Sequence, residues 1–127
     1  MSQRKIELNA LGEALIEAIP ELRTEYFENK RFYSREAFKG HLIYGTVLNP
    51  HLMKWFDEED NPELLARTFD FLEELASSED EEVRNVVTVT VCERIDDSDK
   101  ALQVAHRYMA TNTRKLADEI AEYWSNE

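Results

Sequence analysis

The chain has few of the residues that form β-turns and almost none of the residues that cross-link small domains. Its 127 residues include three glycines, three prolines and one cysteine. All-β domains need frequent turns rich in glycine and proline, so the scarcity of both favours an all-α fold. The single cysteine, Cys92, excludes an internal disulfide framework and a cysteine-based zinc site, and it suits a reducing compartment.

Long apolar runs are missing as well. No segment approaches the roughly 20 consecutive apolar residues that a membrane helix needs. Charged residues interrupt the first 15 positions, where a secretory signal would place its apolar core. We therefore expect a single domain over residues 1–127, in the cytoplasm and without a membrane partner.

Charge of one sign dominates the second half of the chain. The net charge is −12. Residues 1–56 hold eight basic and seven acidic residues, whereas residues 57–127 hold seven basic and twenty acidic residues. Nucleic-acid binding requires clustered cations, so we expect no DNA or RNA partner. A negative field can instead steer a basic protein partner, although solubility alone is a simpler explanation of the same charge.

Apolar residues spaced three and four positions apart predict amphipathic helices. One apolar stripe, over residues 8–22, is broken or kinked at Pro20. The clearest helix covers residues 62–77 and opens with Asp60 or Asn61 as its cap. Its apolar face is expected to contain Leu64, Leu65, Thr68, Phe69, Leu72, Leu75 and Ala76.

Serine and asparagine mark the starts of further helices. Ser34, Asn49 and Ser98 are each expected to cap a helix. A last helix is expected over residues 111–125. Its inward-facing residues are expected to be Leu116, Ile120 and either Tyr123 or Trp124.

The segment SSEDEEVRNVVTVTVCERI, residues 77–95, can be interpreted in two ways. Its valines alternate with threonines as in a β-strand. However, Ser78 and Glu81 stand at the spacing of a capping box, and the acids at 79–82 suit the first turn of a helix. A strand would also need a partner for its backbone N–H and C=O groups. We therefore predict a buried central helix, with a two-stranded hairpin as the alternative.

The segment LLARTFDFLEELASSEDEEVRNVVTVTVCERI resembles one unit of the HEAT family of helical repeats. In that family a leucine-rich helix meets a second helix through a short acidic turn, and the second helix opens with Asp followed by Val-Arg. Here these residues are Asp80 and Val83-Arg84, and the resemblance implies a structural role for Arg84, which would reach an acidic neighbour. No clear second copy appears at the repeat period. We expect six to eight antiparallel helices in a HEAT-like stack or a compact bundle.

In size, acidity and the pattern FDFLEELAS…EEVRNVV…ERI, the chain is similar to small acidic all-helical bacterial immunity proteins. These belong to toxin–immunity pairs such as contact-dependent growth inhibition systems. The resemblance implies a cytoplasmic protein that binds and neutralises a cognate toxin domain, commonly a basic nuclease. We expect it to act by occluding the substrate groove of that nuclease with an acidic surface.

Acidic residues gather at two predicted bends. If the helices run up and down, alternate bends share an end of the fold, so residues 57–60 would lie beside residues 96–99. One or two acids suffice to cap a helix, although each acid could still serve its own helix alone. We predict an acidic rim that binds the partner, with two apolar anchors. The rim is Asp57, Glu58, Glu59, Asp60, Asp96, Asp97 and Asp99, and the anchors are Trp55 and Tyr108.

Catalytic and metal-binding patterns are missing. His41, His51 and His106 are isolated, and Cys92 lies in an apolar run where a buried, inert thiol is expected. We therefore expect no enzymatic activity, no metal site and no cofactor. Two alternatives stay open: a helical adaptor that binds a peptide or partner helix in an apolar groove, and an enzyme whose small-molecule pocket carries no recognisable motif. The oligomeric state does not follow from the sequence.

Overall fold

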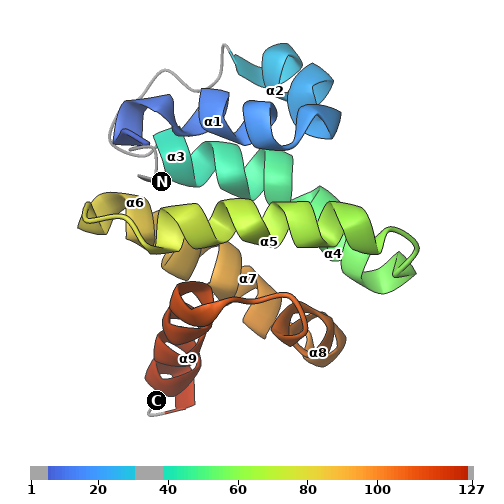
Figure 1. Cartoon of the computed structure of the whole chain (residues 1–127), viewed down its shortest axis with the longest axis vertical. Coiled ribbons are helices and arrows are strands. Elements are labelled where there is room, and N and C mark those ends of the chain that lie inside the picture. The colour runs from blue at the N-terminus through green and yellow to red at the C-terminus, as the bar shows by residue number, and fades with distance from the viewer. Residues whose placement is uncertain (1–5, 31–38, 126–127) are drawn as a thin grey trace.

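The computed structural model describes residues 6–30 and 39–125, and every regular element in those ranges is helical (Figure 1). The all-α fold is confirmed. The α-helices are α1 (Leu11–Ala18), α2 (Arg23–Asn29), α3 (Lys39–Ile43), α4 (Asn49–Glu58), α5 (Pro62–Ala76), α6 (Glu81–Asn85), α7 (Glu93–Asp96), α8 (Asp99–His106) and α9 (Thr111–Ser125). The shorter elements are two 3₁₀ turns, η1 (Leu8–Ala10) and η2 (Pro20–Leu22), and two π-helical segments, η5 (Tyr44–Leu48) and η6 (Val86–Cys92).

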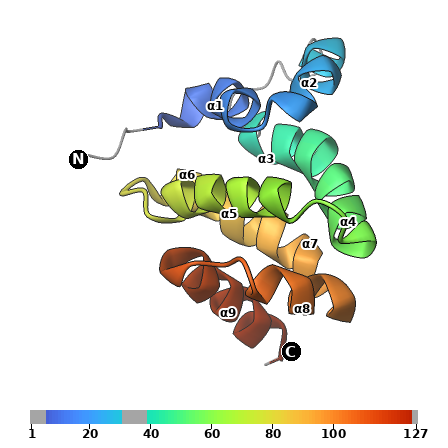
Figure 2. The ribbon, with the colours of Figure 1, turned by 45° about the vertical axis from the view of Figure 1, so that its right-hand side comes forward.

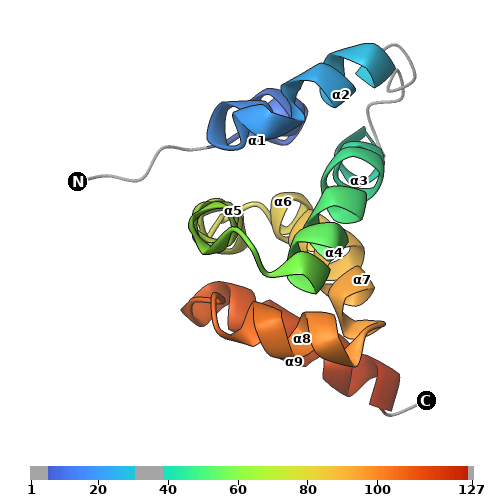
Figure 3. The same ribbon diagram turned by 90° about the vertical axis from the view of Figure 1, so that its right-hand side faces the viewer.

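Helix α5 crosses the middle of the molecule (Figure 1). It contacts α1 on one side, α9 on the other, and α6 and η6 behind it. Figure 2 shows the resulting tiers, with α1 and α2 above α5 and with α8 and α9 below it. In Figure 3 α5 is viewed end-on while α8 and α9 are viewed from the side, so the last tier crosses α5 at a steep angle.

The sequence of α5 accounts for its start and its buried face. Asn61 is the cap, because its side-chain oxygen accepts a hydrogen bond from the Leu64 N–H at 3.1 Å. Each fully buried leucine or phenylalanine contributes about 1.5–3 kcal/mol of transfer free energy. The predicted face is confirmed, since its seven residues are all buried: Leu64, Leu65, Thr68, Phe69, Leu72, Leu75 and Ala76.

Elements α6, η6 and α7 form one continuous helical rod, so the prediction of a central helix over the valine-rich segment is confirmed. The rod contacts α5, α9 and η5, which cover it on several sides. Val83, Val87 and Val91 are buried, whereas Val89 is 48% exposed on the remaining side. The backbone groups that a strand would have left without partners are satisfied within the helix.

The start of this rod differs from the prediction. Ser78 does not cap it. Asp80 is the cap, and its carboxylate accepts a hydrogen bond from the Glu82 N–H at 2.9 Å. The Ser78 hydroxyl instead accepts from the Asp80 N–H, and the Ser78 carbonyl accepts from Arg84 at 2.7 Å. Arg84 therefore binds the turn before α6 through a backbone carbonyl, and it makes no ion pair with a described acidic residue of the kind that the HEAT resemblance implied.

Elements α3, η5 and α4 form a second continuous rod, so the prediction that Asn49 caps a new helix is wrong. Asn49 is buried inside the rod and donates a hydrogen bond to the Thr90 carbonyl of η6 at 3.0 Å. The π turn also explains why Pro50 does not break the rod. The Asn49 N–H reaches back to the Tyr44 carbonyl, and the next residue has no N–H to donate. Ser34 lies outside the described residues.

The last two helices begin where the sequence predicts, and α9 matches its predicted span. The Ser98 hydroxyl caps α8 by accepting from the Ala101 N–H at 3.2 Å, as expected. In α9, Leu116 and Ile120 are buried. Tyr123 and Trp124 are 59% and 47% exposed, so the expectation that one of them faces inward is wrong.

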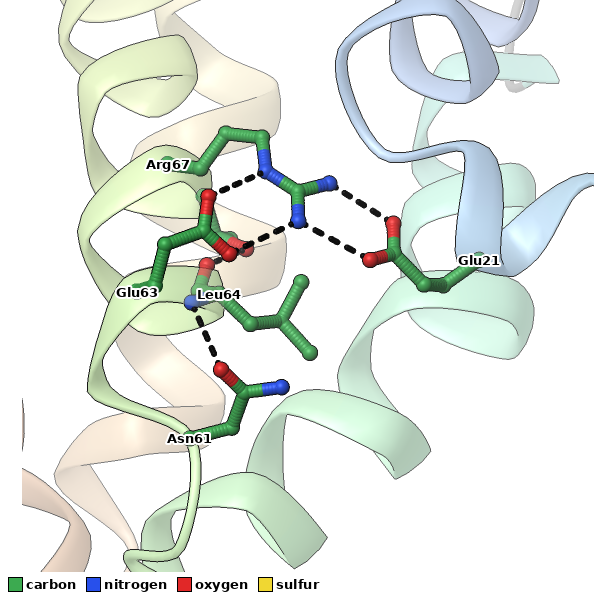
Figure 4. A network of polar contacts seen from close by, with 6 residues as sticks. Glu21, Asn61, Glu63, Leu64 and Arg67 are labelled. Carbon is green, nitrogen blue, oxygen red and sulfur yellow. Dashed lines mark hydrogen bonds and ion pairs between the residues drawn. The ribbon is translucent and has the colours of Figure 1, made fainter.

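The first tier is fastened to α5 by an arginine held between two carboxylates (Figure 4). Arg67 of α5 donates to both oxygens of Glu21 in η2, at 2.7 and 2.9 Å, and to Glu63 one turn earlier. The hydrogen bonds from Arg67 lower the pKa of Glu21. Such a fork-shaped pair orients η2 as well as attracting it.

Candidate partner-binding surface

The two bends that carry the acidic rim lie next to each other. Lys100, one residue after Asp99, donates to the backbone carbonyl of Asp57 at 2.8 Å. Its ammonium also lies 3.7 Å from the Asp57 carboxylate and 3.9 Å from that of Glu59. Helix α4 therefore ends against the first turn of α8, in agreement with the contact between these helices.

Basic side chains are interspersed among the rim carboxylates. Lys54 lies 3.8 Å from Glu58, and Arg94 lies 4.0 Å from Asp97. Arg107 donates to Glu59 at 3.0 Å. Together with Lys100, four cations stand among seven carboxylates, so the rim is less negative than its sequence implies. Asp60, Asp96 and Asp99 make no ion pair with any described residue.

Glu59 ends α4 with its backbone and contacts the α8 end of the rim with its side chain. It has the one positive φ angle among the non-glycine residues described, 50°, and its N–H closes α4 by donating to the Trp55 carbonyl at 3.0 Å. A left-handed residue at this position commonly ends a helix, and glycine is preferred there. The Glu59 carboxylate is then free to accept from Arg107, the neighbour of Tyr108.

Both predicted anchors are partly buried. Tyr108 stacks on Phe69 with ring centroids 6.2 Å apart, so one face of its ring is committed to the core. Trp55 lies 6.0 Å from the His51 ring, and His51 in turn binds Glu25 of α2. Each aromatic residue therefore has a fixed position and some accessible surface beside the rim.

A second acidic cluster, the acidic turn (Glu79, Asp80, Glu81 and Glu82), stands at the other end of α5. In the part of the chain that the structure describes, none of its carboxylates makes an ion pair. Asp80 caps α6, and the others suit the positive end of the helix dipole. The acidic turn thus has unpaired charge but no exposed aromatic residue within its own sequence.

Near this turn, Glu73 of α5 holds the start of α9. Its carboxylate accepts four hydrogen bonds, from the N–H and the hydroxyl of Thr113 and from the N–H and the amide of Asn112, at 2.8–3.1 Å. Burial alone would raise the pKa of Glu73, but these hydrogen bonds outweigh it and lower the pKa. No local sequence pattern indicated this contact, because its partners are about 40 residues apart.

A polar pocket of about 390 Å³ opens between the end of α5, the α6–η6 rod and α9. Charged residues on its walls include Glu81 and Arg84 on one side and Lys115 and Glu119 on the other. Sequence reasoning missed it, since its walls come from three separate segments.

Other reactive groups have ordinary structural environments. Burial, and to a smaller extent Asp96, raises the pKa of Cys92 to about 12, so the thiolate nucleophile is disfavoured. No group of three His, Cys, Asp or Glu side chains within residues 6–30 and 39–125 is placed to hold a metal ion. None of the helices in the same ranges is long and apolar enough to span a membrane.

The described residues define a small, compact all-α domain with seven continuous helical rods. A family model described as a domain of unknown function (DUF7674) matches residues 12–125. Because the match spans most of the chain, the chain belongs to the DUF7674 family. No curated protein and no solved structure matches it.

Proposed function

We propose that this domain is an immunity protein that binds a basic toxin domain, a nuclease, through the acidic rim and covers its substrate groove. A groove that binds nucleic acid is lined with cations for the phosphate backbone. Carboxylates on the rim would occupy the positions of those phosphates, and binding alone would stop the reaction. This mode of inhibition needs no catalytic turnover, cofactor or metal in the immunity domain.

The observation that carries the proposal is that Glu59 connects the rim carboxylates to both aromatic residues. The Glu59 N–H donates to the Trp55 carbonyl, and the Glu59 carboxylate accepts from Arg107, the residue before Tyr108. Tryptophan and tyrosine are enriched among the residues that dominate interface energies. The cations Lys100 and Arg107 hold Asp57 and Glu59 in place, which reduces the entropy lost on binding.

The acids without an internal partner supply the attraction. Asp60 and Asp99 are exposed and unpaired within the described residues, so a partner's lysine or arginine can approach them without displacing an existing ion pair. Complementary charge of this kind accelerates association and orients the encounter more than it strengthens the final complex.

The test compares two double variants with the same change in net charge. Asp60→Lys/Asp99→Lys alters the rim, and Glu79→Lys/Glu82→Lys alters the acidic turn. Each variant and the wild-type chain are immobilised, exposed to lysate of the source organism, and eluted with a salt gradient. Retained proteins are identified, and the association kinetics and nuclease activity of the purified partner are measured.

We expect the wild-type chain and the turn variant to retain a basic nuclease and to inhibit it. The rim variant should associate with it at least about tenfold more slowly, with a weaker dependence on salt. The proposal fails if the two variants slow association equally, or if the retained partners are neither basic nor nucleases.

A second candidate, a helical adaptor, is favoured by a different observation. Leu42 and Val89 are 41% and 48% exposed, and their chain neighbours His41 and Thr90 are hydrogen-bonded at 2.6 Å. Two exposed apolar side chains thus stand on adjacent rods. Binding through them would be largely insensitive to salt, and it would be weakened by Leu42→Ser/Val89→Thr but not by the rim variant.

A further inference from the structure

The polar pocket between the α6–η6 rod and α9 is lined by four charged side chains that do not pair with one another. Glu81 and Arg84 are three positions apart on α6, and Lys115 and Glu119 are four positions apart on α9. Oppositely charged residues at these spacings commonly pair on a helix surface. Neither pair forms here, and none of the four side chains makes an ion pair with any other described residue.

The fold positions the Arg84 side chain and the helix that carries Lys115 and Glu119. Arg84 donates one N–H to the Ser78 carbonyl at 2.7 Å, which leaves its other guanidinium donors available. Lys115 and Glu119 extend from α9, whose start is fixed to α5 by Glu73. The pocket therefore has two cationic and two anionic groups on its walls, with a net charge of zero.

Neutral polar groups complete the walls. The amide of Asn112 donates to Glu73 at 2.8 Å, so its side-chain oxygen remains available as an acceptor. The hydroxyl of Thr88 donates to the Arg84 carbonyl at 3.1 Å and can still accept a hydrogen bond. Thr88 belongs to the π-helical segment η6, and π turns occur frequently at functional sites.

We propose that this pocket binds a small zwitterion of the free α-amino-acid class. Arg84 and Lys115 would bind the ligand carboxylate, and Glu81 and Glu119 would bind its ammonium group. A phosphate or a dicarboxylate would meet the two glutamates, and a diamine would meet the two cations, so the walls favour a ligand with one charge of each sign. A volume of about 390 Å³ lies within the usual range for small-molecule sites.

This inference is independent of the proposed function. The pocket lies beside the acidic turn, whereas the rim lies at the other end of α5, a helix about 22 Å long. No catalytic step is assigned to the pocket. It is proposed as a binding site only.

The test is an NMR titration of the full-length, isotopically labelled chain with glycine, L-glutamine, L-lysine and L-glutamate. Sodium acetate and methylammonium chloride, each carrying one of the two charges alone, serve as control ligands. We expect at least one amino acid to give saturable shifts confined to the amides of residues 81–88 and 112–119. The control ligands should give none at the same concentrations.

A matched pair of variants locates the site. Lys115→Gln/Glu119→Gln removes one charge of each sign from the pocket and should weaken binding at least about tenfold. Arg114→Gln/Glu122→Gln makes the same chemical change on α9 outside the pocket and should bind as the wild type does. All four residues are exposed, so both variants should keep their folds.

Three results would overturn the inference: no saturable shift with any amino acid, an equal response to acetate or methylammonium, or equal binding by both variants. The rim variant Asp60→Lys/Asp99→Lys should bind the amino acid normally. Failure of the pocket and failure of the immunity function can therefore be distinguished.

Discussion

The rim and the opposite end of α5 are both rich in carboxylates, but their carboxylates have different roles. At the rim, Asp57 and Glu59 pair with Lys100 and Arg107, whose side chains are 51% and 61% exposed. At the other end, Glu73 and Asp80 accept hydrogen bonds from backbone N–H groups at the starts of α9 and α6. Exposed ion pairs contribute little to stability, whereas helix caps contribute more.

The two groups of carboxylates therefore differ in how much they stabilise the fold and in how available they are to a partner. Carboxylates that cap a helix are committed to the fold, and their removal should destabilise it. Rim carboxylates in exposed ion pairs add little to the fold and can exchange an internal cation for one on a partner. The same residue type thus stabilises one end of the domain and leaves the other end available for recognition.

The largest effect on stability is expected for Glu73→Ala. It removes the acceptor of four hydrogen bonds and leaves the first N–H groups of α9 without their partner, at a cost of about 2 kcal/mol. Urea unfolding measures this loss. Asp70→Ala on the exposed face of the same helix is the control and should change the free energy of unfolding by less than about 0.5 kcal/mol. Equal losses of stability in Glu73→Ala and Asp70→Ala would contradict the role of Glu73 in holding the start of α9.

Acidification should reveal the same contact. The pKa of Glu73 is lower in the folded state than in the unfolded chain, so its contribution is complete above the unfolded pKa, about 4.3. The contribution is lost as the pH falls through the lower, folded pKa. Below about pH 4.3, the free energy of unfolding should therefore fall more steeply in the wild type than in Glu73→Gln. Identical slopes in the wild type and Glu73→Gln would contradict the assignment.

A smaller loss is expected for Asp80→Ala, because only one hydrogen bond caps α6. The expected destabilisation is about 1 kcal/mol, measured by urea unfolding. Glu79→Ala, one residue earlier in the acidic turn, removes a carboxylate that makes no hydrogen bond to the described residues and should have a smaller effect. If Glu79→Ala lowers the free energy of unfolding as much as Asp80→Ala does, the negative charge of the turn stabilises it, and the cap hydrogen bond does not.

The smallest effect is expected at the rim. Glu59→Gly relieves a left-handed backbone that costs a non-glycine residue about 1 kcal/mol, and it removes exposed ion pairs worth a similar amount or less. The free energy of unfolding should therefore change by less than about 1 kcal/mol in either direction. Glu59→Ala loses the ion pairs without relieving the backbone and should be the less stable of the two. High salt should reduce the contribution of the ion pairs.

Local patterns predicted most of the fold. The spacing of apolar residues located α5 and its buried face, and the caps at Asn61 and Ser98 were correct because both act on residues within three positions. The acids of the first turn and the lack of a strand partner also identified the valine-rich rod correctly as a helix. Two of the rim ion pairs, Lys54–Glu58 and Arg94–Asp97, have helical spacings that a reader of the sequence could find.

The errors share a physical cause, which is a contact between distant segments. Asn49 has the sequence context of a cap, but its amide bonds to Thr90, 41 residues away. Lys100 and Arg107 reduce the charge of a bend more than 40 residues earlier in the chain. Tyr123 and Trp124 continue an apolar stripe that packs on the core only as far as Ile120. No local pattern carries this information.

The paired π turns have a consequence for how the chain tolerates insertions and deletions. A π turn closes over five residues where an α turn closes over four, so each rod has room for an extra residue at that level. Removing one residue from η6 would let the rod become a plain α-helix, and α7 would keep nearly the same rotation relative to α6, because the π turn already holds the extra residue. Ile95 would therefore stay in the core. The same deletion within α5, which has no π turn, would rotate the residues after it by about 100° and move Leu75 away from the core. Deletions of a single residue should therefore be easier to accommodate in η6 than in α5.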